Sequence, residues 1–187
     1  RSRSSIRAFN DTPVSRGTVT RILDMAQRAP SGTNTQPWHV HVATGPVRDA
    51  ITAEAYAMFQ RGETDSYAEH DYYPDIWTDT HRDRRRAVGW GLYGLLGIEK
   101  GDRDASMQQA ARNYLLFDAP VGIFVTIERY LAKGSWFDVG LYAQTLMLAA
   151  RAEGLHTCPQ ASWIVTPGPV YRHLDIPDDQ ILVVGIA

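Results

Sequence analysis

The stretch SWFDVGLYAQTLMLAARAEGL, residues 135–155, carries the strongest helix signal in the chain and decides the class of fold. Ser135 stands in a capping position, Asp138 falls in the first turn, and Gly154 ends a run in which alanine and leucine recur at helical spacing. Just before it, VGIFVTI at 121–127 is a short apolar, β-branched run that predicts a buried strand. A long helix that follows such a strand indicates helices packed on a sheet.

Two earlier segments fit the same pattern. Over 18–28, apolar residues recur at helical spacing, and Pro30 ends the predicted helix. WHVHV at 38–42 alternates, which predicts a strand with His39 and His41 on one face. No further metal ligands cluster near these two histidines in the sequence, so we expect an outward-facing pair and no metal site. Separated strands and helices together predict an α+β domain.

The composition is that of one soluble globular domain over residues 1–187, with 44% hydrophobic and 21% charged residues. The net charge of -2 provides no basic field, so we expect neither a nucleic-acid partner nor a membrane partner. Cys158 is the only cysteine, which excludes a disulfide framework, and its apolar surroundings predict a buried, inert thiol. Neither a membrane span nor a signal peptide is recognisable, and we expect a cytoplasmic protein.

The N-terminal segment RSRSSIRAF, residues 1–9, combines arginines with short hydroxyl side chains. Guanidinium groups and hydroxyls are suited to binding a phosphate monoester. Ile6 and Phe9 would anchor the segment on the body and hold its polar residues in place. A solvated basic tail is the alternative interpretation. The polar residues of the segment are Arg1, Ser2, Arg3, Ser4, Ser5 and Arg7.

The segment APSGTNTQPW, residues 29–38, places several short polar side chains between two prolines. Asn34 and Gln36 carry both donors and acceptors, which suit an imide or carbamoyl edge. Ser31 and Gly32 allow hydroxyl and backbone groups to approach a ligand closely. The alternative is a capped helix end followed by a turn.

The segment GLHTCPQASW, residues 154–163, follows the strongest predicted helix. Its proline fixes the course of the chain, and the backbone N–H groups of Gln160, Ala161 and Ser162 would be free to donate to a heteroatom of a ligand. A simple connection from helix to strand is the alternative.

In this order and spacing, the three segments resemble the FMN-dependent nitroreductase family over essentially the whole chain. The resemblance implies a nitroreductase-like α+β fold, with a central, mostly antiparallel sheet flanked by helices and with FMN at a homodimer interface. The first segment would grip the FMN phosphate, the second would contact the flavin from the partner subunit, and the third would place the backbone of Ala161 near the flavin N5. The implied cofactor-binding residues are Arg3, Ser4, Ser5, Arg7, Pro30, Ser31, Gly32, Asn34, Gln36, Pro159, Gln160 and Ala161.

The same resemblance implies an NAD(P)H-dependent enzyme that reduces nitroaromatic or quinone-like acceptors by a ping-pong mechanism. Hydride transfer at the flavin N5 would need no catalytic side chain, and each site would be shared between two subunits. Two alternatives stay open. One is a flavin-fragmenting enzyme of the same superfamily, and the other is a non-catalytic FMN-binding module.

Two regions depart from the common family pattern. Members usually continue beyond the strand that ends here in GIA, so we expect that a C-terminal segment is missing. The charged, tyrosine-rich segment at about 61–105 is interpreted as a lid or excursion, and it looks like the branch of the family that reduces nitroaromatic acids. Within it, GWGLYG at 89–94 follows no strand, so we interpret its glycines as close helix packing and not as a dinucleotide fingerprint.

The polar residues of this excursion have two possible roles. One of its arginines would neutralise a substrate carboxylate or meet the cofactor phosphate, or all of them form a solvated helix face. Its aromatic residues would stack on a flat substrate, or would pack together as a small core of the lid. The arginines are Arg82, Arg84, Arg85 and Arg86, and the aromatic residues are Tyr72, Tyr73 and Trp77.

Overall fold

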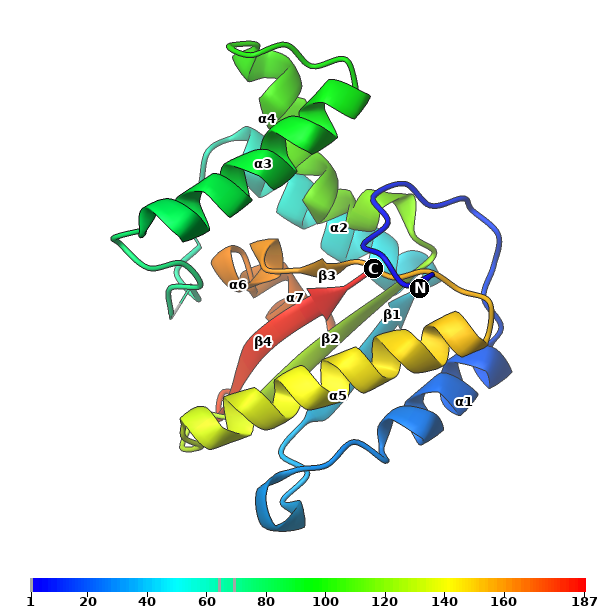
Figure 1. Ribbon diagram of the computed structural model, residues 1–187. Coiled ribbons are helices and arrows are strands. Elements are labelled where there is room, and N and C mark those ends of the chain that lie inside the picture. The colour runs from blue at the N-terminus through cyan, green and yellow to red at the C-terminus, as the bar shows by residue number, and fades with distance from the viewer. Residues whose placement is uncertain (1, 64, 69) are drawn as a thin grey trace.

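Figure 1 shows the computed structural model of the chain, which describes residues 2–63, 65–68 and 70–187. Arg1, expected beside the phosphate site, lies outside the described residues. The helices are α1 (Arg16–Ala26), η1 (Gly32–Asn34), α2 (Gly45–Gln60), α3 (Asp79–Leu95), α4 (Arg103–Ala111), η2 (Arg112–Asp118), α5 (Lys133–Ala152), α6 (Ser162–Val165) and α7 (Gly168–His173). The strands are β1 (His39–Thr44), β2 (Val121–Glu128), β3 (Pro159–Gln160) and β4 (Gln180–Ile186).

The strands form one sheet in the order β1-β2-β4-β3, and every neighbouring pair is antiparallel. β1 pairs with β2 so that His41 lies opposite Phe124. The register of β2 against β4 shifts between Val125 and Thr126. β3 adds two residues at the edge of β4, with Gln160 opposite Gly185. This confirms the expected α+β fold with a central antiparallel sheet.

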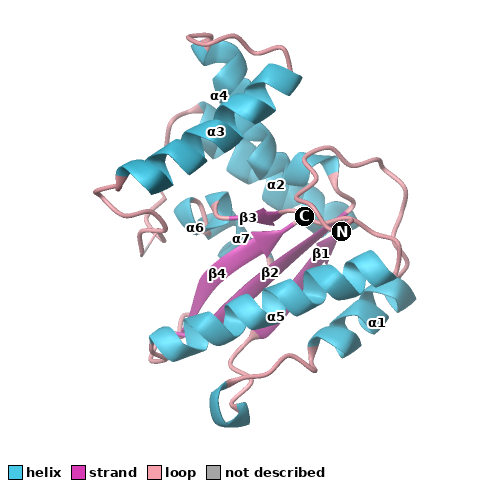
Figure 2. Cartoon of the chain, viewed as in Figure 1, coloured by secondary structure: helices cyan, strands magenta, loops and turns pink. Residues whose placement is uncertain are grey.

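Helices cover both faces of the sheet, as Figures 1 and 2 show. α1 and α5 lie on one face, and α2, α6 and α7 lie on the other. Because successive strand residues point to opposite faces, Val125 packs into the core beneath α1 and α5, while Phe124 packs beneath the other layer. Both side chains are completely buried. The two cores hold the sheet rigidly between the helical layers.

α5 begins earlier than the sequence indicates. Its N-cap is Ala132, and the Ser135 N–H donates to the Ala132 carbonyl oxygen over 2.9 Å, so Ser135 is already helical and the expectation that it caps the helix is wrong. Asp138 consequently lies beyond the first turn and is buried. Across the described residues, no helix has both the length and the apolar character needed to cross a membrane.

α1 is also shifted toward the N-terminus relative to the prediction over 18–28. The hydroxyl of Ser15 accepts a hydrogen bond from the Thr18 N–H over 3.1 Å, which fixes the start of the helix. Gln27 and Arg28 close the helix as a turn, before Pro30 is reached.

The excursion predicted at about 61–105 contains α3, which stands apart from the sheet in Figure 1. All residues of α3 are described and none is buried. A Cβ atom added at Gly89, Gly91 or Gly94 would meet nothing within 4 Å among the described residues, apart from the helix's own nearby backbone. The expectation that GWGLYG marks close helix packing is therefore wrong, because no neighbouring element packs against these glycines.

Candidate functional site

The N-terminal arm lies against the segment that leads into β3. Ser5 forms an isolated parallel bridge with Thr157, and the Ile6 N–H donates to the Thr157 carbonyl oxygen over 3.3 Å. The Arg151 guanidinium at the end of α5 donates to the Ser2 hydroxyl over 3.2 Å. These contacts bring together two predicted binding segments that are about 150 residues apart in the chain.

The described arginines of the arm are accessible and form no ion pairs with the other described residues. Arg3, Ser5 and Arg7 are half-buried, and Ser4 is exposed. Within the described residues, Arg3 and Arg7 form no ion pair. Unpaired guanidinium groups beside short hydroxyls are the donor set that a phosphate monoester requires, so the arm fits an FMN phosphate.

Gln160 has a buried side chain and a paired backbone N–H, whereas the sequence predicted that this N–H would be free for a ligand. Its side chain is 2% exposed, donates from Nε2 to the Asn113 carbonyl oxygen over 2.7 Å, and accepts from Trp163 Nε1 over 3.2 Å. Cys158 and Ala187 exchange both backbone hydrogen bonds, over 2.8 and 3.0 Å. Because bonded pairs recur every two residues, the N–H of Gln160 belongs to the ladder with Gly185 and is not free for a ligand. The expectation of a free Gln160 N–H is wrong.

Ala161 sits where β3 ends and α6 begins. It is the N-cap residue of α6 and is half-buried. Its N–H donates to no acceptor among the described residues, whereas its carbonyl oxygen accepts from the Ile164 N–H over 3.0 Å. An unpaired backbone donor at this point fits the role expected for it beside a heteroatom of a ligand.

The loop that contains Pro30, Ser31, Gly32, Asn34 and Gln36 is exposed over 32–36 and is held in an unusual shape. Its backbone has φ values of 48° at Thr33, 59° at Asn34 and 46° at Gln36. The Gln36 N–H donates to the Ser31 hydroxyl over 2.9 Å, and the Gln36 side-chain amide donates to Asn34 Oδ1 over 3.0 Å. Part of the hydrogen-bonding capacity expected for a ligand is therefore used to shape the loop.

A buried carboxylate supports this loop from beneath. Oδ2 of Asp138 on α5 accepts a hydrogen bond from the Gly32 N–H over 3.1 Å, and Asp138 is 7% exposed. From the sequence, this residue was predicted only to carry a charge in the first turn of the helix. The available signal was its position four residues before Tyr142 and eight before Leu146, which places an acid on the buried stripe of the helix.

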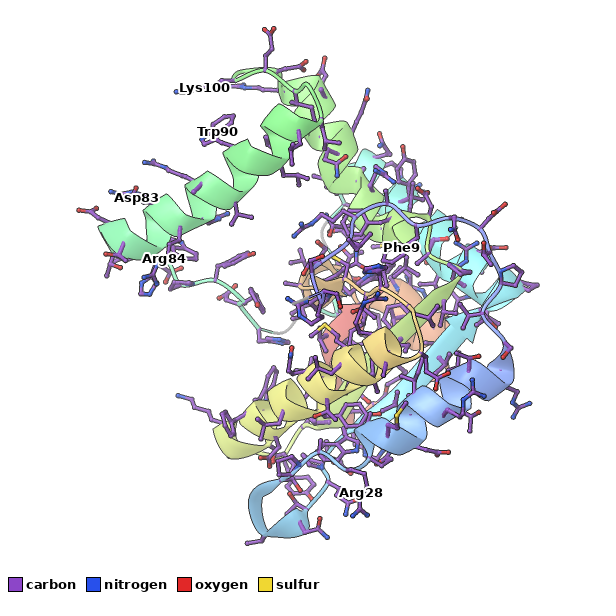
Figure 3. The ribbon with its side chains drawn as sticks, turned by 45° about the vertical axis from the view of Figure 1, so that its right-hand side comes forward. Phe9, Arg28, Asp83, Arg84, Trp90 and Lys100 are labelled. Carbon is purple, nitrogen blue, oxygen red and sulfur yellow. The ribbon has the colours of Figure 1, made fainter. Side chains whose placement is uncertain are left out.

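One chain does not bring this loop to the N-terminal arm. Asp138, beneath the loop, and Ala152, at the end of α5 next to the arm, are separated by about 20 Å at 1.5 Å per residue. Figure 3 shows the same separation, with Arg28 just before the loop at the opposite end of the domain from Phe9 of the arm. The predicted site residues thus form two groups, one at each end of α5.

The other candidates from the sequence have structural roles. Cys158 is 1% exposed, which confirms the expected burial, and burial raises the pKa of its thiol while the nearby Arg7 offsets part of the rise. His39 and His41 are half-buried, and Glu128 and Thr126 of β2 contact them over 2.8 and 3.1 Å, while the His39 side chain keeps 41% of its surface exposed. Burial lowers the pKa of His41. In the part of the chain that the structure describes, no group of three ligating side chains is arranged for a metal.

A hollow of about 580 Å³ lies between the N-terminal segment, α1 and α5. Its lining is mostly apolar and includes Phe9, Ile22, Leu155 and Ile186. It borders the arm through Ile6, but no arginine or lysine is among the described residues that line it, so we place the candidate site at the polar surface of the arm and not in this hollow.

His70 is a second residue that the sequence analysis missed. Its ring meets Trp136 of α5 edge-on at a centroid distance of 4.7 Å. Both ring nitrogens are inaccessible and have no hydrogen-bond partner among the described residues, and burial lowers the pKa of the ring. No pattern in the sequence pointed to this contact, because the surrounding segment lacks periodicity.

Comparison with known proteins identifies relatives of the whole chain. The model of the nitroreductase family matches residues 1–187. A 4-nitrobenzoate reductase from Pseudomonas putida is 39% identical over 186 residues, which cover 100% of this chain and 81% of that protein. A nitrobenzene nitroreductase from Ectopseudomonas oleovorans is 35% identical over 187 residues, with 100% and 82% covered. The crystal structure of an FMN- and NADPH-dependent nitroreductase, NfnB from Sphigopyxis sp. strain HMH, superimposes with a TM-score of 0.93 at 39% identity and covers 99% of this chain and 83% of its own.

Proposed function

The chain belongs to the nitroreductase family, and from this premise we propose that it is an FMN-dependent oxidoreductase that uses NADH or NADPH to reduce nitroaromatic or quinone-like acceptors. The observation that carries the proposal is the contact of the N-terminal arm with the segment before β3. Within the described residues, this contact places two arginines that form no ion pair and the Ala161 N–H, which has no acceptor, on neighbouring segments at the edge of the sheet.

In this proposal the arm holds the phosphate end of FMN. Arg3 and Arg7 supply charge and in-plane donors, and Ser4 and Ser5 supply hydroxyls. The backbone bridge from Ser5 to Thr157 keeps these side chains in place before the cofactor binds, which lowers the ordering cost of binding.

Pro159, Gln160 and Ala161 line the proposed flavin position with backbone atoms. When bound, FMN supplies the hydride-accepting and hydride-donating N5. The Ala161 N–H is the donor that would face this atom, and the side chain of Gln160 holds the segment to Asn113. Cys158 is buried, and burial raises the pKa of its thiol, so the proposal assigns this residue no role as a nucleophile.

The proposal includes alternating use of one site by the nicotinamide donor and the acceptor, which predicts ping-pong kinetics. It also includes a homodimer in the cytoplasm. The separation of the 30–36 loop from the arm supports a shared site, because a two-fold axis would let the loop of one subunit complete the site of the other.

The test is the visible absorption spectrum of the purified protein loaded with FMN, recorded without oxygen. Flavin bands that bleach with NADH or NADPH and return after a nitroarene is added would support the proposal and identify the donor. A protein that does not retain added FMN would refute it. Fragmentation of reduced FMN after oxygen is admitted would instead favour the flavin-fragmenting alternative, and FMN binding without reduction by either nucleotide would favour a non-catalytic module.

A further inference from the structure

In the loop before α3, aromatic rings gather around one arginine of that helix. The guanidinium carbon of Arg85 lies over the ring of Tyr73 at 4.9 Å from its centroid and over the ring of Trp77 at 5.2 Å. Tyr73 contacts Trp77 at 5.6 Å and Tyr72 at 4.9 Å between centroids. We call Tyr72, Tyr73, Trp77 and Arg85 the aromatic cluster.

Arg85 differs from the neighbouring arginines because aromatic rings fix its side chain, while no carboxylate among the described residues neutralises its charge. Arg82 is paired with Asp79, whereas Arg84 and Arg86 are exposed and contact no aromatic ring among the described residues. Arg85 itself forms no ion pair or hydrogen bond in the part of the chain that is described. A guanidinium that is held by ring faces keeps its in-plane N–H donors free, and these match the two oxygens of a carboxylate.

The cluster is not the core of a helix packed on the body. Tyr72 and Tyr73 are 58% and 51% exposed. Figure 3 shows Asp83 and Arg84, which directly precede Arg85, on the free end of α3, clear of the sheet and its helices. Flat apolar faces and a free cation are therefore presented together to solvent, which is the chemistry that recognises an aromatic ring bearing a carboxylate.

The segment that leads to the cluster is anchored on the body of the domain. The Asp65 carboxylate accepts from the Gly168 N–H over 2.7 Å, and Tyr67 meets Tyr171 edge-on at 5.5 Å. His70 then contacts Trp136 on α5. Figures 1 and 3 both show this segment passing near α6, which begins directly after Ala161. The chain that leads into the cluster is thus anchored on α7 and on the first turns of α5.

From these observations we propose that the aromatic cluster is the recognition site for aromatic carboxylates, with Arg85 as the residue that binds the carboxylate and the rings of Tyr73 and Trp77 as its stacking surface. The inference rests on the proposed function, because it gives that function a substrate class: nitroarenes that carry an acid group. Arg85 acts on the choice of substrate and not on the transfer of electrons.

The test compares two substrates and two variants of the FMN-loaded protein. The substrates are 4-nitrobenzoate and its methyl ester, which share the nitroarene but differ in charge. Arg85→Met removes the cation and keeps a long side chain. We expect KM for 4-nitrobenzoate to rise about tenfold or more, from loss of a charge-assisted contact, with little change in kcat and with KM for the ester changed less than about twofold.

Arg84→Met is the matched control, since it removes the same charge one residue away without touching a ring, and it should leave both KM values unchanged. Binding of benzoate, followed by calorimetry, gives a readout without turnover and should weaken by a similar factor only in Arg85→Met. Equal effects of the two variants, or equal losses for acid and ester, would overturn the inference. If the wild-type protein reduces neither compound with NADH or NADPH, the proposed function fails instead, and benzoate binding still decides whether the cluster recognises carboxylates.

Discussion

Three residues of the 30–36 loop adopt left-handed backbone conformations, and none is glycine. This conformation costs about 1 kcal/mol or more for each such residue, with less for Asn34 because asparagine tolerates it best. Strain of this kind persists only where surrounding contacts impose it. Here those contacts are the hydrogen bonds to Ser31 and Asp138, so the loop is held ready to bind in the absence of any ligand.

Replacing Asp138 with alanine should release this loop. The variant loses the acceptor for the Gly32 N–H, and we expect the free energy of unfolding to fall by about 1–3 kcal/mol. FMN affinity should fall as well, and Asp138→Asn should recover most of both losses, because its side-chain oxygen still accepts the bond. Chemical denaturation and FMN titration measure the two effects.

Asp24→Ala, on the exposed side of α1, is the control for removing a negative charge. If Asp138→Ala binds FMN as well as Asp24→Ala does, the carboxylate does not position the loop.

Arg3→Ala tests the phosphate assignment. Arg3 has no ion-pair partner within the described residues, so its loss should leave the fold intact. We expect the Kd for FMN to rise about tenfold or more, because a charge-assisted contact to phosphate is removed. Flavin content after gel filtration and fluorescence titration provide the measurement, with Arg16→Ala on α1 as the control. A variant that retains full FMN and activity would contradict the assignment.

Among the elements, the sequence predicted several that pack through an apolar face, but it did not predict α2, although Ile51 and Ala55 are buried in the core. The helix around 135–153 and the strand at 121–127 were found because their side chains enter the two cores. For α3 the sequence offered only the alternative of a solvated helix face and no helix bounds, and none of its residues, all of which the structure describes, is buried. The shifted starts of α1 and α5 reflect capping contacts that propensity alone does not resolve.

The contact between β4 and α6 depends on Gly185. A Cβ atom at this position would lie 2.8 Å from Cγ of Trp163, whose side chain is completely buried and donates to Gln160. We expect Gly185→Ala to lower the free energy of unfolding by about 1–3 kcal/mol, because the indole cannot move aside. Urea denaturation followed by tryptophan fluorescence measures the change.

Gly134→Ala is the matched control, since its Cβ would meet no atom within 4 Å among the described residues. A Gly185→Ala protein as stable as this control would show that the close approach is not a constraint.

The proposed homodimer predicts how activity changes when two impaired variants are combined in mixed dimers. Arg3→Ala and Asn34→Asp, each made alone, should impair both sites of a dimer. The second change keeps a residue type that tolerates the left-handed backbone but removes the amide donor. In mixed dimers of the two variants, one site contains neither substitution, so random mixing should restore about a quarter of the wild-type sites. FMN content and nitroarene reduction of the co-expressed pair measure this recovery.

Co-expression of wild-type protein with the double variant is the control. Its mixed dimers carry one substitution in each site and should gain nothing over the wild-type homodimers present. Lack of recovery in the first mixture would mean that Arg3 and Asn34 of one chain serve the same site, and would contradict the shared-site arrangement.

The three proposed binding segments could be recognised in the sequence, but their arrangement in space could not. Short polar residues and arginines are visible in a sequence, whereas the bridge from Ser5 to Thr157 joins distant parts of the chain and depends on the finished sheet. The inward side chain of Gln160 likewise follows from its place opposite Gly185. Arg85 could not be separated from Arg82, Arg84 and Arg86, because only the fold shows which arginine lies over aromatic rings.

The exposure of α3 has a consequence for how such an enzyme changes over generations. A helix that buries no side chain contributes little to the global free energy of unfolding, so substitutions along it are nearly free of the packing constraints that restrict the two cores. Selection can therefore alter the residues that we propose to bind the acceptor while the sheet and the proposed cofactor-binding segments remain as they are. In this proposal, acceptor preference depends on α3 and the loop before it, whereas the ability to fold depends on the two cores.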